Sequence, residues 1–82
     1  MSNRGTLLTL SELSPGQSAV VDEVVGDDSL ASRLMEMGIL DGEAIEVIGR
    51  APMGDPTEYA LRGYRISLRR NESDRVLVSL VP

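Results

Sequence analysis

Two short motifs restrict the backbone of this chain more than any other part of its sequence. Residues 33–42 have the sequence RLMEMGILDG, and residues 50–56, which begin eight positions after the first motif ends, have the sequence RAPMGDP. The first motif predicts a helix that stops at a glycine before a strand, and the second predicts a rigid loop after that strand. Glycine allows, and proline imposes, backbone dihedrals that most residues do not share. We therefore expect both motifs to shape a surface, and neither has the chemistry of a catalyst.

The length and composition predict one small domain that is held together by aliphatic packing. The chain has 82 residues, and a domain of this size buries only about 60% of the surface that its unfolded chain exposes. It contains no cysteine, so it can form neither a disulfide nor a thiolate metal site. Phe and Trp are also absent, which leaves Leu, Val, Ile and Met to pack around Tyr59 and Tyr64. No linker or repeat divides the chain, so we expect a single domain over residues 1–82.

Two helical segments are expected in the first half of the chain. Thr9 and Glu12 match a capping box, which predicts a single helical turn there. Asp28 or Ser29 can cap a longer helix, and Gly38 stands where a left-handed helix end is expected. The apolar face of this longer helix consists of Leu30, Leu34 and Met37.

The remaining apolar segments predict five short strands. The strands expected at residues 57–61 and 64–69 form a hairpin closed by Arg62-Gly63. In the second of these strands, alternate side chains point inward (Tyr64, Ile66 and Leu68) and outward (Arg65, Ser67 and Arg69). A polar turn at residues 71–74 precedes the last strand. Because closure removes the exposed edges of a sheet, we expect a mainly β fold, a small SH3-like β-barrel of about five strands with one short α-helix. The expected strands are residues 19–25, 43–49, 57–61, 64–69 and 76–81.

No residue pattern predicts catalysis, a cofactor or a metal site. The chain has neither His nor Cys, and its serines lie in polar turns or on an outward strand face without an evident base. Its glycine-containing loops lack the lysine and the spacing of phosphate-binding loops. Only oxygen and thioether donors are available for a transition metal. We interpret Asp27, Asp28, Asp41 and Glu43 as helix caps and solvated turns rather than as metal ligands.

The charge of the chain is unevenly distributed. Residues 1–61 carry three arginines and eleven acidic side chains, whereas residues 62–82 carry five arginines and two acidic side chains. Such a basic face could bind nucleic acid, with a tyrosine stacked on a base, or could be a solvated strand face paired with nearby carboxylates. The net charge of −5 and the absence of lysine favour the second interpretation, so we expect no nucleic-acid binding. The five arginines are Arg62, Arg65, Arg69, Arg70 and Arg75.

The start of the chain predicts no membrane segment. Residues 1–5 are polar, and the apolar stretch after them is interrupted by Thr9, Ser11 and Glu12. This stretch is too short and too mixed for a signal peptide or a membrane span. We therefore expect a cytoplasmic protein that does not itself cross the membrane.

Four apolar residues near the motifs are candidates for a protein contact. Leu40 and Met53 stand in turns beside Gly, Pro or Asp, where side chains tend to point out of a fold. For Met35 and Ile39 the sequence leaves core and surface equally open. Exposed together beside Arg33, Glu36 and Arg50, such residues would form an apolar patch of the composition found in protein interfaces. Methionine also suits a surface that repacks against a partner.

The two motifs resemble those of the FeoA family, small cytoplasmic proteins of bacterial ferrous iron uptake. The resemblance extends over residues 7–81, with weaker support from Leu13, Gly16 and the hairpin from Arg62 to Arg69. A minor departure is Ser73, where the family often has alanine. What the resemblance implies is an SH3-like barrel without catalytic activity that contacts a FeoB-type GTPase permease and is recruited by it to the membrane. The implied partner-binding residues are Met35, Glu36, Met37, Gly38, Ile39, Leu40, Arg50, Pro52, Met53, Gly54, Asp55 and Pro56.

Two alternatives of another class remain at this point. The same barrel occurs as the C-terminal module of iron-dependent transcriptional repressors, although this chain lacks a helix-turn-helix pattern. A nucleic-acid-binding barrel is the other. The sequence also leaves self-association and any effect on a partner's GTPase rate open.

Overall fold

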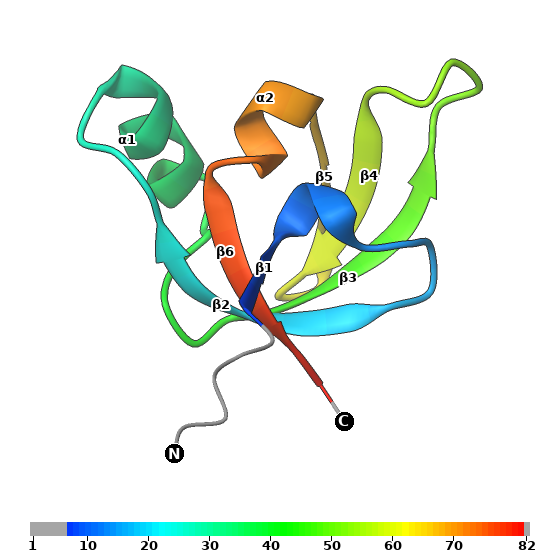
Figure 1. Ribbon diagram of the computed structural model, residues 1–82, viewed down its shortest axis with the longest axis horizontal. Helices are drawn as coiled ribbons and strands as arrows, with labels where there is room; N and C mark the ends of the chain where they lie inside the picture. The colour runs from blue at the N-terminus through cyan, green and yellow to red at the C-terminus, as the bar shows by residue number, and fades with distance from the viewer. Residues whose placement is uncertain (1–6, 82) are drawn as a thin grey trace.

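The computed structural model describes residues 7–81, which form six strands, two α-helices and one 3₁₀ helix (Figure 1). The expected mainly β architecture is confirmed, and every expected strand is present within a residue or two of its predicted bounds. In chain order the elements are β1 (Leu7–Thr9), η2 (Leu10–Glu12), β2 (Ser18–Val24), α1 (Ser29–Glu36), β3 (Ala44–Arg50), β4 (Thr57–Leu61), β5 (Tyr64–Leu68), α2 (Arg70–Ser73) and β6 (Val76–Leu80).

The strands make one antiparallel sheet in the order β1-β6-β2-β3-β4-β5. This sheet bends strongly around the core, with α1, α2 and the β3–β4 loop along its upper rim (Figure 1). The ends of the strand order, β1 and β5, do not pair with each other within residues 7–81, so hydrogen bonds do not close the barrel. The extra strand is β1, whose Leu8 lies opposite Val78 of β6. Three residues carry too little periodicity to reveal a strand that a distant partner creates.

The core lies inside the bend and is lined by alternate residues of the strands. In β3, Ile45 and Val47 are buried while Glu46 is exposed, as the sequence predicted. Each such aliphatic side chain contributes about 1.5–3 kcal/mol when it is removed from water. The buried set is completed by Tyr59 and by residues of the helical segments. Its main members are Leu10, Leu13, Ala19, Val21, Leu34, Ile39, Ile45, Val47, Tyr59, Leu61, Leu68, Val76 and Val78.

Helix α1 begins and ends as its sequence predicts. The Asp28 carboxylate accepts a hydrogen bond from the Ala31 N–H at 3.2 Å, which makes Asp28 the N-cap. The Gly38 N–H donates to the Met35 carbonyl at 3.0 Å, and Gly38 has φ of +99°. This left-handed conformation is open to glycine and strained for residues with a Cβ.

Helix α2 occupies the segment for which a polar turn was expected, so that prediction was wrong. The Arg69 N–H donates to the Glu72 carboxylate at 2.8 Å, which satisfies a backbone group at the start of the helix. Ser73 is buried, and its hydroxyl donates to the Arg69 carbonyl at 3.3 Å. Side-chain capping and burial therefore turn a polar segment into a helical turn.

The β4–β5 hairpin has the predicted turn, but the burial of one side chain differs from the prediction. Arg62 and Gly63 have φ of +53° and +85°, as a tight two-residue hairpin turn requires. Leu68 is fully buried as expected, whereas Tyr64 is 42% exposed instead of pointing into the core. The Tyr64 hydroxyl donates a hydrogen bond to the Met37 carbonyl, which holds the ring across the end of α1.

Candidate partner-binding surface

The first motif places most of its predicted contact residues at or near the surface. The segment after α1 turns sharply, because the Ile39 N–H donates to the Leu34 carbonyl at 3.2 Å. Leu40 is 44% exposed, in agreement with its predicted position in a turn. Ile39 is completely buried, so it belongs to the core and is removed from the candidate surface. Of the other members, Met35 and Glu36 are exposed and Met37 and Gly38 are half-buried.

The second motif forms a well-defined loop between β3 and β4. The Ala51 N–H donates to the Pro56 carbonyl at 2.9 Å, and the Gly54 N–H donates to the Ala51 carbonyl at 2.7 Å. Met53 stands at the tip of this loop and is 91% exposed. Binding residues are often carried by loops that a rigid scaffold positions, so Met53 is available for a contact. Pro52, Gly54 and Asp55 are also exposed, and Pro56 is half-buried.

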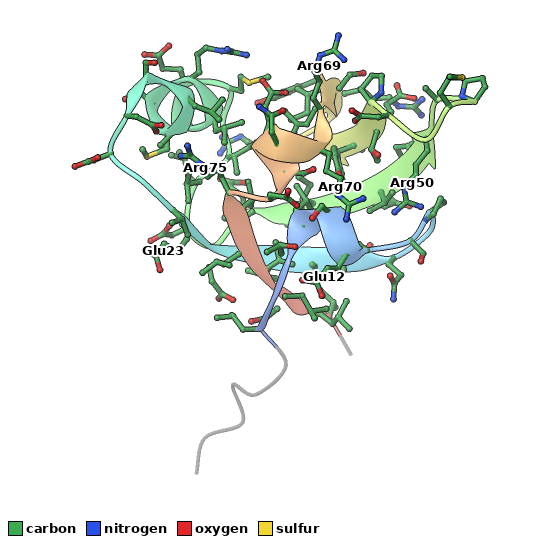
Figure 2. All side chains as sticks on the ribbon, turned by 45° about the horizontal axis from the view of Figure 1, so that its top comes forward. Glu12, Glu23, Arg50, Arg69, Arg70 and Arg75 are labelled. Atoms are coloured by element: carbon green, nitrogen blue, oxygen red, sulfur yellow. The ribbon has the colours of Figure 1, made fainter. Side chains whose placement is uncertain are left out.

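Arg50 has a structural contact in addition to its predicted surface position. Its guanidinium donates to the Leu13 carbonyl at 2.6 Å, which ties the end of β3 to the segment after η2. Figure 2 shows Arg50 beside the β3–β4 loop, on the side that faces η2. Arg50 therefore positions the loop as well as contributing charge beside it.

The two motifs do not form the single patch that the sequence suggested. Helix α1 and the β3–β4 loop lie at opposite ends of the upper rim, with α2 between them (Figure 1). Contacts with α2 connect the two segments. Arg33 Nη2 lies 2.8 Å from a Glu72 carboxylate oxygen, and the Asp55 carboxylate accepts from the Arg70 N–H at 2.9 Å. The exposed residues of the predicted contact set, together with α2, form a surface that we call the motif rim. These residues are Met35, Glu36, Leu40, Arg50, Pro52, Met53, Gly54 and Asp55.

Sequence analysis did not identify α2 as a part of this surface. Its contribution depends on ion pairs and hydrogen bonds with segments that are distant in the chain. The available signal was the spacing of Glu72 from Arg69, which is the spacing of a capping residue.

A polar cleft of about 270 Å³ lies between η2, the β3–β4 loop and α2. Arg50, Arg70 and Asp55 line it, together with small hydroxyl side chains. Beneath it, burial raises the pKa of Tyr59, although hydrogen bonds with Ser73 and Thr57 oppose this shift. The Tyr59 phenol therefore stays protonated at neutral pH and packs as part of the core.

Neither a metal cluster nor a membrane-spanning helix is found in the described part of the chain. Within residues 7–81, no group of three or more His, Cys, Asp or Glu side chains comes together in a way that could hold a metal ion. None of the helices in this range has both the length and the hydrophobicity needed to cross a bilayer.

The fold and its displayed loops define a small SH3-like domain with a structured surface. A family model described as the FeoA domain matches residues 8–80. The chain therefore belongs to the FeoA family, as the resemblance of its two motifs implied.

A relative from Porphyromonas gingivalis connects the family with ferrous iron transport. It is an Fe(2+) transport protein A/Fe(2+) transporter FeoB fusion protein, and it is 38% identical to this chain over 74 residues. The match covers 90% of this chain and 9% of the relative, so the chain spans less than a tenth of that protein's length.

Solved structures of FeoA proteins confirm the fold. A FeoA-like protein from Clostridium acetobutylicum is 34% identical with a TM-score of 0.88, and the match covers 100% of this chain and 92% of that one. FeoA from Stenotrophomonas maltophilia, complexed with zinc and described as an SH3 domain protein, is 37% identical with a TM-score of 0.78. That match covers 88% of this chain and 89% of the other.

A manganese-dependent transcriptional repressor shares the same fold. Its TM-score is 0.84 at 16% identity, and the match covers 92% of this chain and 37% of the repressor. Identity this low shows the fold alone, so the likeness carries no argument for a repressor function.

Proposed function

We propose that this protein is a non-enzymatic accessory component of ferrous iron transport that acts in the cytoplasm by contacting a FeoB-type GTPase permease. The observation that carries the proposal is the relative in which FeoA and FeoB belong to one polypeptide. Fusion raises the effective concentration of two domains for each other, which favours domains that act together. We infer the same association with a FeoB-type partner for the domain in this chain.

The motif rim supplies the surface for this contact. Met53 and Leu40 are exposed apolar side chains, and each can become a buried anchor when a partner covers it. Because α1 and the β3–β4 loop lie at opposite ends of the rim, the partner would span α2 and meet both segments. The Arg33–Glu72 pair and the Asp55–Arg70 hydrogen bond hold the three segments in one arrangement.

Leu40→Glu and Met53→Glu test this contact. A charge that is buried without a partner is costly enough to break a modest complex. On an exposed position, however, the same substitution should change the free energy of unfolding by less than about 0.5 kcal/mol. We expect both variants to melt like the wild type, to lose co-purification with FeoB, and to fail to restore ferrous-iron-dependent growth in a strain without this gene.

Leu80→Glu is the matched control. Leu80 is also an exposed leucine, at 39%, but it lies in β6 outside both motifs. This variant should retain binding and growth. Full function in both motif variants would rule out the motif rim as the contact surface, and failure of Leu80→Glu as well would show that any added charge disrupts the complex.

A further inference from the structure

Within residues 7–81, the outer edge of β5 has no partner strand, and it is flanked by basic side chains. Strand β5 is last in the strand order and pairs with β4 alone within residues 7–81. Residues 62–70 contain four arginines and no acidic side chain, in a chain of net charge −5. An unpaired strand edge can pair with a strand of another chain, so proteins commonly protect such edges or use them for binding.

The hairpin register determines which backbone groups face outward. Leu61 and Tyr64 flank the two-residue turn, so they form a hydrogen-bonded pair, and the alternation continues to Ile66 and Leu68. The N–H and C=O groups of Arg65 and Ser67 therefore point away from β4. They offer two donors and two acceptors, at adjacent outward positions, to an incoming strand.

The side chains along this edge differ between the two faces. Arg65 and Ser67 are exposed on one face, and Arg69 continues the alternation because its backbone is still extended, with φ of −78° and ψ of 163°. Figure 2 shows Arg69 pointing away from the body of the molecule. Tyr64 and Ile66 occupy the other face, where the first is exposed and the second half-buried.

The arginines of this edge can exchange their present partners at low cost. Arg65 lies 3.8 Å from Glu58, and their side chains are 62% and 43% exposed. Exposed pairs of this kind contribute little to stability. Arg69 has no carboxylate within salt-bridge distance in the described part of the chain.

We propose that the β5 edge binds an extended segment of another protein in which acidic and apolar residues alternate. The added strand would pair with the outward groups of Arg65 and Ser67. Its acidic side chains would lie opposite Arg65 and diagonal to Arg69, and its apolar side chains would lie beside Tyr64 and Ile66.

A second copy of this chain fits the edge poorly. In an antiparallel pairing of two β5 strands, Arg65 of one copy lies opposite or diagonal to an arginine of the other, whichever register is chosen. Like charges at these positions are destabilising. The basic edge thus opposes self-pairing while it accepts an acidic strand.

The β5 edge is separate from the exposed motif residues, so the proposal does not depend on a FeoB contact there.

The probe is a short synthetic peptide of alternating glutamate and valine, titrated into the folded, isotopically labelled protein. We expect saturable binding, with amide shift changes centred on β5 and slower hydrogen exchange at the Arg65 and Ser67 amides. A matched peptide with lysine in place of glutamate should not bind. Equal binding of both peptides, or shifts centred elsewhere, would overturn the proposal.

Two pairs of variants separate the backbone contribution from the charge contribution. Ser67→Pro removes an outward N–H that the β4 ladder does not use, whereas Ser67→Ala keeps it. We expect Ser67→Pro to lose binding and Ser67→Ala to retain it. Arg65→Glu should weaken binding about tenfold and Arg65→Gln less. If Ser67→Pro does not fold, the two Arg65 variants still test the proposal, because unchanged peptide affinity in Arg65→Glu contradicts it. Wild-type dimers that form through β5 would also overturn it.

Discussion

At the scale of single residues, Gly38 occupies a position where both the backbone conformation and a tertiary contact disfavour any larger residue. Its φ of +99° disfavours any residue with a Cβ, and a Cβ built there would overlap the Tyr64 hydroxyl. Gly42 has a comparable φ of +88° but open space around it. The two glycines therefore separate backbone strain from steric overlap.

We expect Gly38→Ala to lower the free energy of unfolding by more than about 1 kcal/mol and by more than Gly42→Ala does. Combining Gly38→Ala with Tyr64→Phe should recover part of that loss, because Phe lacks the overlapping hydroxyl. Urea denaturation of the wild type and of these three variants measures these differences. Equal losses for the two glycine variants would mean that Tyr64 does not restrict position 38.

At the scale of elements, one side chain makes contacts at both ends of the link between α2 and α1. The carboxylate of Glu72 accepts from the Arg69 N–H at 2.8 Å and also lies 2.8 Å from Arg33 of α1. Its side chain is only 12% exposed, so the capping hydrogen bond is partly shielded from water. Glu72 thus caps α2 and connects it to α1.

Glu72→Ala should reduce the free energy of unfolding by about 1 kcal/mol, the usual cost of losing a cap. Glu72→Gln keeps an acceptor for the Arg69 N–H and should cost less. Asn71→Ala, an exposed substitution in the same helix, is the control and should have little effect. Chemical denaturation reports all three, and a Glu72→Ala variant as stable as the control would show that α2 forms without this cap.

At the scale of the whole molecule, one ion pair joins the start of α1 to the start of β6. Arg75 binds both carboxylate oxygens of Asp28, at 3.0 and 2.8 Å, and donates to the Val25 carbonyl at 3.1 Å. Hydrogen bonds from Arg75 and from the Ala31 N–H hold the pKa of Asp28 far below its usual range. Segments that are 47 residues apart are connected in this way.

The sign of the pH dependence follows from this lowered pKa. The unfolded chain takes up the Asp28 proton near pH 4, before the folded protein does, so the contribution to stability is complete above that pH and declines below it. We expect Asp28→Asn, which retains capping ability, to melt at a lower temperature than the wild type at pH 7. This difference should shrink as the pH falls below 4. Asp27→Asn is the neighbouring control, and a difference that stays constant with pH would exclude the ion pair as its cause.

The sequence by itself determined the features that depend on neighbouring residues. The glycine stop at Gly38, a helix cap at Asp28 or Ser29 and the Arg62-Gly63 turn each follow from the conformations that those residue types allow, and the structure selects Asp28 as the cap. The alternation of Ile45 and Val47 likewise identified the buried face of β3. These preferences act within a few residues, so they can be inferred from the sequence before the fold is known.

Only the tertiary structure decided the features that depend on distant partners. Strand β1 exists because β6 pairs with it, and α2 lies against η2 and between the two motif segments. The motif residues were expected in one patch, but the bend of the sheet places α1 and the β3–β4 loop at opposite ends of the rim. Tyr64 was expected in the core because of its alternation, yet its hydroxyl bonds to the Met37 carbonyl at the surface. Local preferences cannot encode such contacts, because they arise from how the sheet curves and from which segments it brings together.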